Sequence, residues 1–265
     1  MAAPVTAPAA RARIASTIES LHEEATRFFT ALDGGGSFRE DVWQRPGGGG
    51  GVSRVLAEGE TFEKCGVNRS VVQGVMPPQM AQRLGARAGG EVESAFFVAG
   101  TSIVAHPRSP KVPTVHLNVR YFEVAAPDGT VLDAWFGGGT DLTPTYPYPE
   151  DAIHFHRALK ATCDRHHPSF HARFKAWCDH YFVNLHRGEE RRGVGGIFFD
   201  DLASGRFRTR SARTSSCPMT MRCAPAWPRS TCAWGTSSGR PNCSSRCTRV
   251  ASSRRKAPRR SSACT

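Results

Sequence analysis

Residues 116–124, with the sequence HLNVRYFEV, alternate apolar and polar side chains and therefore predict a β-strand with two different faces. One face carries side chains suited to a hydrophobic core: Leu117, Val119 and Tyr121. The other face carries an imidazole, an amide and a guanidinium: His116, Asn118 and Arg120. These groups bind carboxylates well, although a polar face can also simply meet solvent. The segment requires a sheet with one covered face and leaves the role of the other face open.

Two further segments can add polar groups to that face. In TSIVAHP, residues 101–107, Ser102 and His106 share a face, and a strand beside 115–124 would bring them to the same pocket. In WFGGGTDLTP, Asp141 follows three glycines at the end of a strand. A carboxylate there could accept hydrogen bonds from ligand N–H groups, or it could cap the following turn. The FFDD sequence at 198–201 has the same ambiguity, and we predict a turn there.

The histidines allow a metal site without indicating one. His154 and His156 are two residues apart on a predicted helix, about 200° around its axis, so only one of them can face a site. His106, His116, one of this pair and His186 could then bind a metal, although no H-E-x-x-H spacing supports it. His186 could instead cap the end of a helix.

The remaining pattern predicts an α+β domain. Helices are expected at 10–32, 148–167 and 168–187, and strands within 94–107, 112–144 and 191–201. The five glycines at 47–51 predict a loop without regular structure, which is either a linker or a mobile loop over an anionic substrate.

The charge divides the chain in two. The whole chain has a net charge of +12. All 23 acidic residues lie in residues 1–204, whereas the charged residues of 205–265 are all basic. The tail lacks Leu, Ile and Tyr, so it cannot bury an apolar face, and its cysteines lack zinc-finger spacing. We predict a folded domain at 1–204 and a disordered tail at 205–265. The tail is either a basic arm that binds RNA or an acidic partner, or the product of a reading frame that slipped soon after Leu202.

Other features of the sequence predict a cytoplasmic protein. No apolar run is long enough for a membrane span. The N-terminal segment has no signal-peptide core, and its acidic residues do not suit a transit peptide. Three scattered cysteines in the body are expected to be free thiols: Cys65, Cys163 and Cys178.

Seven stretches in order resemble the oxygen-dependent coproporphyrinogen III oxidases. They are WQRPGGGGGVSRVL, FEKCGVN, HPRSPKVPTVHLNVRYFEV, WFGGGTDLTP, DAIHFHRALK, KAWCDHYFVNLHR and GVGGIFFDDL, within residues 40–202. The resemblance implies a large antiparallel sheet with helices on both faces, and a homodimer. It implies oxidative decarboxylation of two propionates of coproporphyrinogen III to vinyl groups, giving protoporphyrinogen IX in haem biosynthesis, with molecular oxygen as co-substrate and no organic cofactor.

The resemblance also implies roles for particular residues. His116 matches the general acid/base, and Asp141 matches the carboxylate that holds the pyrrole N–H groups. The implied substrate-binding set is Ser102, Asn118, Val119, Arg120 and Asp141. A divalent metal would be held by His106, His116, His156 and His186, which selects His156 over His154.

The chain also departs from the family pattern. The segment between His186 and the double glycine is one residue longer than usual, and the tail replaces the family's C-terminal third. We therefore expect a poorly soluble or inactive polypeptide, because lost strands would leave an open sheet edge. Two alternatives to the enzyme remain, namely an inactive tetrapyrrole-binding remnant and nucleic-acid binding through 205–265.

Overall fold

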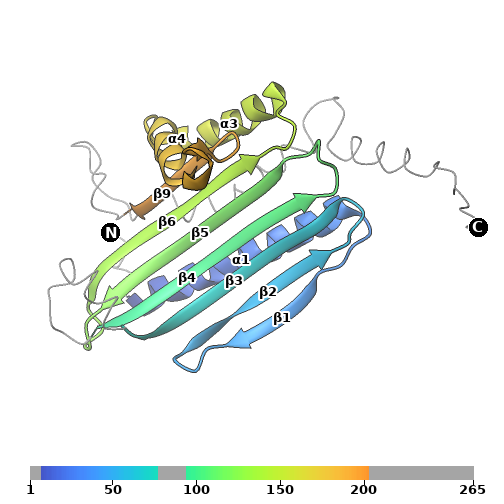
Figure 1. Cartoon of the computed structure of the whole chain (residues 1–265). Coiled ribbons are helices and arrows are strands. Elements are labelled where there is room, and N and C mark those ends of the chain that lie inside the picture. Colours follow the sequence, from blue (N-terminus) through green and yellow to red (C-terminus); the bar gives the residue numbers. More distant parts are fainter. Residues whose placement is uncertain (1–6, 77–93, 203–265) are drawn as a thin grey trace, which may run out of the picture.

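A seven-stranded antiparallel sheet forms the centre of the protein in the computed structural model, which describes residues 7–76 and 94–202 (Figure 1). The order across the sheet is β1-β2-β3-β4-β5-β6-β9. The strands span Arg39–Gln44 (β1), Gly49–Ala57 (β2), Phe62–Val75 (β3), Ala95–Pro107 (β4), Thr114–Ala125 (β5), Val131–Thr143 (β6) and Gly196–Leu202 (β9). Strands β1 to β6 pair in chain order, and β9 returns beside β6. The predicted α+β class with a large antiparallel sheet is confirmed.

Three α-helices accompany the sheet in the described part of the chain. Their bounds are Ala7–Asp33 (α1), Pro149–Asp164 (α3) and Phe170–Tyr181 (α4). Helix α1 runs along one face across β3 and β4, whereas α3 and α4 lie by the β9 edge of the sheet (Figure 1). The predicted helices at 10–32 and 148–167 are confirmed. Residues 149–151 open α3 as expected, with proline first and two acidic residues in the first turn.

The predicted helix at 168–187 ends early, at Tyr181. The last helical hydrogen bond runs from the Phe182 amide to the Cys178 carbonyl, and Phe182 then leaves helical geometry. The chain continues as a small two-stranded ladder, β7 (Val183–Asn184) with β8 (Glu190–Arg191), around the 3-10 turn η1 (Leu185–Arg187). This excursion returns the chain to the sheet at β9.

One hydrophobic cluster joins all three helices to the same face of the sheet. Its helical members are Ala25, Phe29, Phe155, Leu159, Cys163, Phe170 and Phe174. Its members from the sheet include Val67, Ile103, Leu117, Val119, Leu142, Ile197 and Phe199. The apolar residues of β5 lie on this face, as the alternation predicted.

Helix α4 also reaches the opposite face, because it lies across the edge strand β9. The Phe174 ring packs on Phe199 at 5.1 Å, whereas the Tyr181 ring stacks on Phe198 at 4.0 Å. Neighbouring residues of a strand point to opposite faces. Helical side chains therefore contact both faces of the sheet at β9.

The glycine run is not a loop throughout, so that prediction is wrong. Gly49, Gly50 and Gly51 lie in β2 and pair with β3. A Cβ atom at Gly51 would overlap the Trp43 ring of the neighbouring strand and the backbone of Arg69. Glycine is present because two groups approach the backbone closely, which a rule based on flexibility does not capture.

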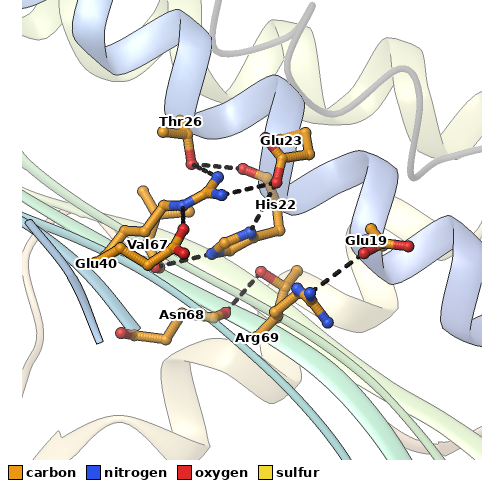
Figure 2. Close-up of polar contacts among 10 residues, drawn as sticks. Glu19, His22, Glu23, Thr26, Glu40, Val67, Asn68 and Arg69 are labelled. Carbon is orange, nitrogen blue, oxygen red and sulfur yellow. Dashed lines mark hydrogen bonds and ion pairs between the residues drawn. The ribbon is translucent and has the colours of Figure 1, made fainter. Parts of the chain in front are cut away.

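Charged groups also attach α1 to the sheet (Figure 2). Arg54 of β2 forms ion pairs with Glu23 of α1 at 2.9 Å and with Glu40 of β1 at 2.7 Å. Beside them, the fully buried His22 contacts the Val67 carbonyl through Nε2 at 3.2 Å. Burial lowers the pKa of His22, and the nearby Arg54 guanidinium lowers it further. The helix is thus fixed by a neutral imidazole within a network of ions.

The C-terminal end of α1 is attached by a single carboxylate. Asp33 accepts hydrogen bonds from four backbone N–H groups, those of Gly36, Glu60, Thr61 and Phe62. Burial alone would raise the pKa of Asp33, but these four donors outweigh burial and the pKa is lowered.

Three smaller predictions can be compared with the described residues. Cys65, Cys163 and Cys178 are free and buried, as expected, and burial raises the pKa of both the Cys65 and Cys178 thiols to about 12. Among the described helices, none is both long and apolar enough to cross a membrane. The predicted tail at 205–265 lies outside the described residues.

Candidate functional site

The polar residues of three strands share one face of the sheet. Ser102 of β4 lies directly opposite Asn118 of β5. On the other side of β5, His116 lies opposite Asp141 and Arg120 opposite Gly137. Directly opposed residues in an antiparallel pair project to the same face. The structure therefore places the imidazole, amide, guanidinium and carboxylate on one face of the sheet.

Asp141 is the most buried polar group of this face, with a side chain that is 3% exposed. Its Oδ1 atom lies 2.9 Å from His116 Nδ1 and 2.7 Å from Arg192 Nη2, and its Oδ2 atom accepts from Arg192 Nε at 2.9 Å. Arg192 therefore binds the carboxylate with two nitrogens, which is the strong geometry for this pair. Asp141 lies within β6 and does not cap a turn.

Arg192 is held from its other side by an aromatic ring. Its guanidinium lies 3.8 Å from the centre of the Phe182 ring, and that ring packs edge-on to His116. His156 of α3 contacts the Val194 carbonyl at 2.9 Å and so supports the same segment. The excursion between α4 and β9 thus lies over the carboxylate end of the polar face.

The second arginine of the face is also paired. Arg120 donates through Nη1 to Asn118 Oδ1 at 2.8 Å and forms an ion pair through Nη2 with Asp200 Oδ2 at 2.9 Å. The Phe198 ring lies 5.9 Å from this guanidinium. Asp200 belongs to β9, so the predicted turn at FFDD is wrong.

Glycines leave the surface between these polar groups free of side chains. Gly66, Gly100, Gly137 and Gly139 lie at positions of the polar face on β3, β4 and β6. A Cβ atom at Gly137 would overlap both the Arg120 guanidinium and the Asp200 carboxylate. Glycine at position 137 is therefore required for the ion pair.

The four histidines of the implied metal site do not converge. His106, His116 and His156 each form a ring-nitrogen hydrogen bond within the protein. His106 and His186 are exposed. Over residues 7–76 and 94–202, no three His, Cys, Asp or Glu side chains are grouped so that they could hold a metal ion. The residues as placed do not fit a metal. His186 lies beyond the end of α4, so it does not cap that helix.

Val119 differs from the other implied substrate-binding residues. Its side chain is buried in the core cluster on the opposite face. Only its backbone could contact a ligand beside Asn118 and Arg120.

Sequence reasoning missed two residues of the site, Arg192 and Asp200. Arg192 is one of two adjacent arginines in a segment without periodicity, and nothing local indicates that it returns to Asp141, 51 positions earlier. Asp200 is one of two adjacent acids, and the sequence does not tell which one faces Arg120. A count of charges would have given a signal, because an arginine on a half-covered face needs a carboxylate partner or an anionic ligand.

The site therefore combines an anion-binding group with a proton-transfer pair. Arg120 and Asn118 can bind a carboxylate. Because the Asp141 carboxylate accepts, His116 carries its proton on Nδ1, and its Nε2 atom is left to accept or return a proton. Each arginine is paired within the protein, so a bound anion competes with an internal partner.

Comparison with known proteins agrees with this geometry. A family model described as coproporphyrinogen III oxidase matches residues 13–228. The chain is 50% identical to coproporphyrinogen-III oxidase 1, chloroplastic, of Arabidopsis thaliana over 72% of its length and 51% of the relative's. It is 47% identical to the oxygen-dependent coproporphyrinogen-III oxidase of Drosophila melanogaster over 78% of its length and 54% of the relative's. The human mitochondrial enzyme of the same name is 52% identical over 65% of this chain and 38% of its own length. The chain thus spans about half the length of the first two relatives.

Proposed function

Because this chain belongs to the coproporphyrinogen III oxidase family, we propose that its polar sheet face binds coproporphyrinogen III and supports oxygen-dependent decarboxylation. Two propionates would become vinyl groups, giving protoporphyrinogen IX for haem biosynthesis. Each propionate loses carbon dioxide and a hydride equivalent, and one molecule of oxygen takes up that hydride equivalent with a proton from solvent to become hydrogen peroxide. The observation that carries the proposal is the convergence of His116, Asn118, Arg120 and Asp141 on one face.

The residues of the chain supply binding and proton transfer in this scheme. Arg120 and Asn118 bind a propionate, and Ser102 extends this polar surface on the adjacent strand. His116 exchanges a proton with the pyrrole through Nε2, while Asp141 fixes its orientation. For Asp141 to hold pyrrole N–H groups as well, those groups must displace part of its contact with Arg192. No step depends on an organic cofactor or a metal.

Three further properties belong to this proposal. We propose a homodimer, as the resemblance implies, and no binding of nucleic acid by the domain. We also propose a cytoplasmic location. The names of two relatives place those proteins in the chloroplast and the mitochondrion, so fractionation of the host cell is the measurement that tests the location.

A second candidate function is binding of the tetrapyrrole without turnover. The supporting observation is that Arg120 and Asn118 contact each other, and His116 and Asp141 form a separate pair. Binding of an anion at Arg120 therefore does not by itself require proton transfer at His116.

One experiment separates the two candidates. The purified full chain is mixed with coproporphyrinogen III in air, and oxygen consumption and vinyl product are followed. Turnover that is lost in His116→Gln and kept in His180→Gln, at an exposed histidine, supports the enzyme. Tetrapyrrole binding without oxygen consumption supports the second candidate. Absence of both binding and turnover refutes both candidates.

A further inference from the structure

An irregularity in β9 directs one carboxylate toward the site. The pairing of β6 with β9 shifts register between Gly138 opposite Phe199 and Phe136 opposite Leu202. Within this shift, Asp201 has a φ of 56°, a value that is strained for a residue with a side chain. The Asp201 amide donates to Asp200 Oδ1 at 3.0 Å. The bulge thus orients the Asp200 carboxylate, whose other oxygen contacts Arg120.

Asp200 occupies the place that a ligand carboxylate needs. Its Oδ2 atom lies 2.9 Å from Arg120 Nη2, the nitrogen next to the one that binds Asn118. The two side chains of the pair are 33% and 38% exposed, so the pair is accessible from solvent. Pairs with this exposure contribute little to stability and exchange readily with other ions.

The charge balance of the face supports the same conclusion. Arg120 is balanced by Asp200, and Arg192 is balanced by Asp141. These two pairs together carry no net charge. A tetra-anionic ligand gains little attraction from such a surface until one internal carboxylate moves away.

We propose that Asp200 is a specificity-determining residue, an internal carboxylate that occupies Arg120 until a substrate propionate displaces it. This inference rests on the proposed function and deepens it, since it concerns how the same site selects its ligand. Asp200 lowers the affinity for every anion, and only a ligand with additional contacts to the face overcomes this competition. Removing its charge strengthens anion binding.

The test uses the full chain and Asp200→Asn. Asparagine keeps the oxygen that accepts from the Asp201 amide, so the bulge is preserved. The probe is coproporphyrin III, the stable oxidised form with four carboxylates, and its fluorescence reports Kd. We expect Kd to fall at least about threefold, and the gain to shrink with added salt. A porphyrin with four N-methylpyridinium groups should bind equally or more weakly.

Two variants provide the controls. Asp133→Asn in β6 removes a negative charge as Asp200→Asn does, and Asp133 likewise accepts a hydrogen bond from the next backbone amide. Among the described residues, Asp133 forms no ion pair with an arginine. Its Kd for coproporphyrin III should stay unchanged. Asp200→Glu keeps the charge and should not tighten binding.

The outcomes distinguish this inference from the function on which it rests. If the unsubstituted chain binds coproporphyrin III and Asp200→Asn binds it no more tightly, the inference is wrong and the proposed function stands. Tighter binding of the cationic porphyrin as well would show a general loosening of the face and would also overturn it. If neither the unsubstituted chain nor Asp200→Asn binds any porphyrin, the proposed function fails and the inference fails with it.

Discussion

Replacing Asp141 with asparagine should destabilise the fold as well as the site. The variant weakens three hydrogen bonds to a carboxylate that is 3% exposed. Hydrogen bonds to charged groups contribute about 1.5–3 kcal/mol each, with the low end appropriate where the partner reaches water. Arg192 and His116 are 34% and 32% exposed and can be hydrated, and asparagine keeps one acceptor. We therefore expect a loss of about 2–3 kcal/mol in the free energy of unfolding.

Urea unfolding and amide hydrogen exchange check this expectation. Exchange should accelerate at the amides of Arg192 and Val194, because they belong to the segment that the carboxylate holds. Asp164→Asn is the control, since its pair with Lys160 is exposed, and it should change stability by less than about 0.5 kcal/mol. The reasoning is refuted if Asp141→Asn costs no more than this control and leaves both amides protected. Loss of turnover in an Asp141 variant would then reflect chemistry alone.

Three further expectations concern other parts of the molecule. Asp33→Ala should lower the free energy of unfolding in urea by about 3–5 kcal/mol, because it leaves buried N–H groups without an acceptor. A loss below about 1 kcal/mol would contradict this expectation. The lowered pKa of His22 means that the unfolded chain binds a proton below about pH 6.5 that the folded chain does not, so stability should fall with acidification. His22→Gln should make this pH dependence shallower without abolishing it, because the pKa of His171 is also lowered by burial. If the melting temperature of this variant falls between pH 6.5 and 5 as steeply as that of the unsubstituted chain, His22 is not the group responsible. Arg192→Lys should lower the free energy of unfolding in urea by about 1–2 kcal/mol, because lysine forms neither the two-nitrogen contact with Asp141 nor the stack on Phe182. Stability equal to that of the unsubstituted chain would be evidence against this role of Arg192.

The site could be predicted from sequence where one strand carries the pattern. Alternation in 116–124 assigned each side chain to a face, and a two-residue period leaves no choice once one face is apolar. In the observed register, the antiparallel neighbours place Ser102 and Asp141 on the same side as Arg120. These inferences needed the three strands to be adjacent and in the register that keeps each apolar set on the covered face.

Other features depended on contacts that no local pattern encodes. The register shift in β9 determines that Asp200 faces Arg120. The early end of α4 determines that Arg192 returns to Asp141. The glycines of β2 were misread because their cause is the Trp43 ring of another strand. In the first two cases the deciding partner lies far along the chain, and in the third it lies on a neighbouring strand.

The two arginine pairs of the face differ in a way that separates their roles. Both arginines are about a third exposed, but Asp141 is 3% exposed whereas Asp200 is 38% exposed. Opening the Arg192 pair leaves a carboxylate buried without its cation, which is costly, whereas opening the Arg120 pair leaves a carboxylate that water can solvate. An incoming propionate therefore exchanges with Asp200 first, while the Asp141 pair keeps His116 oriented. The anion-binding group and the proton-transfer group of one face can thus respond independently to the same ligand.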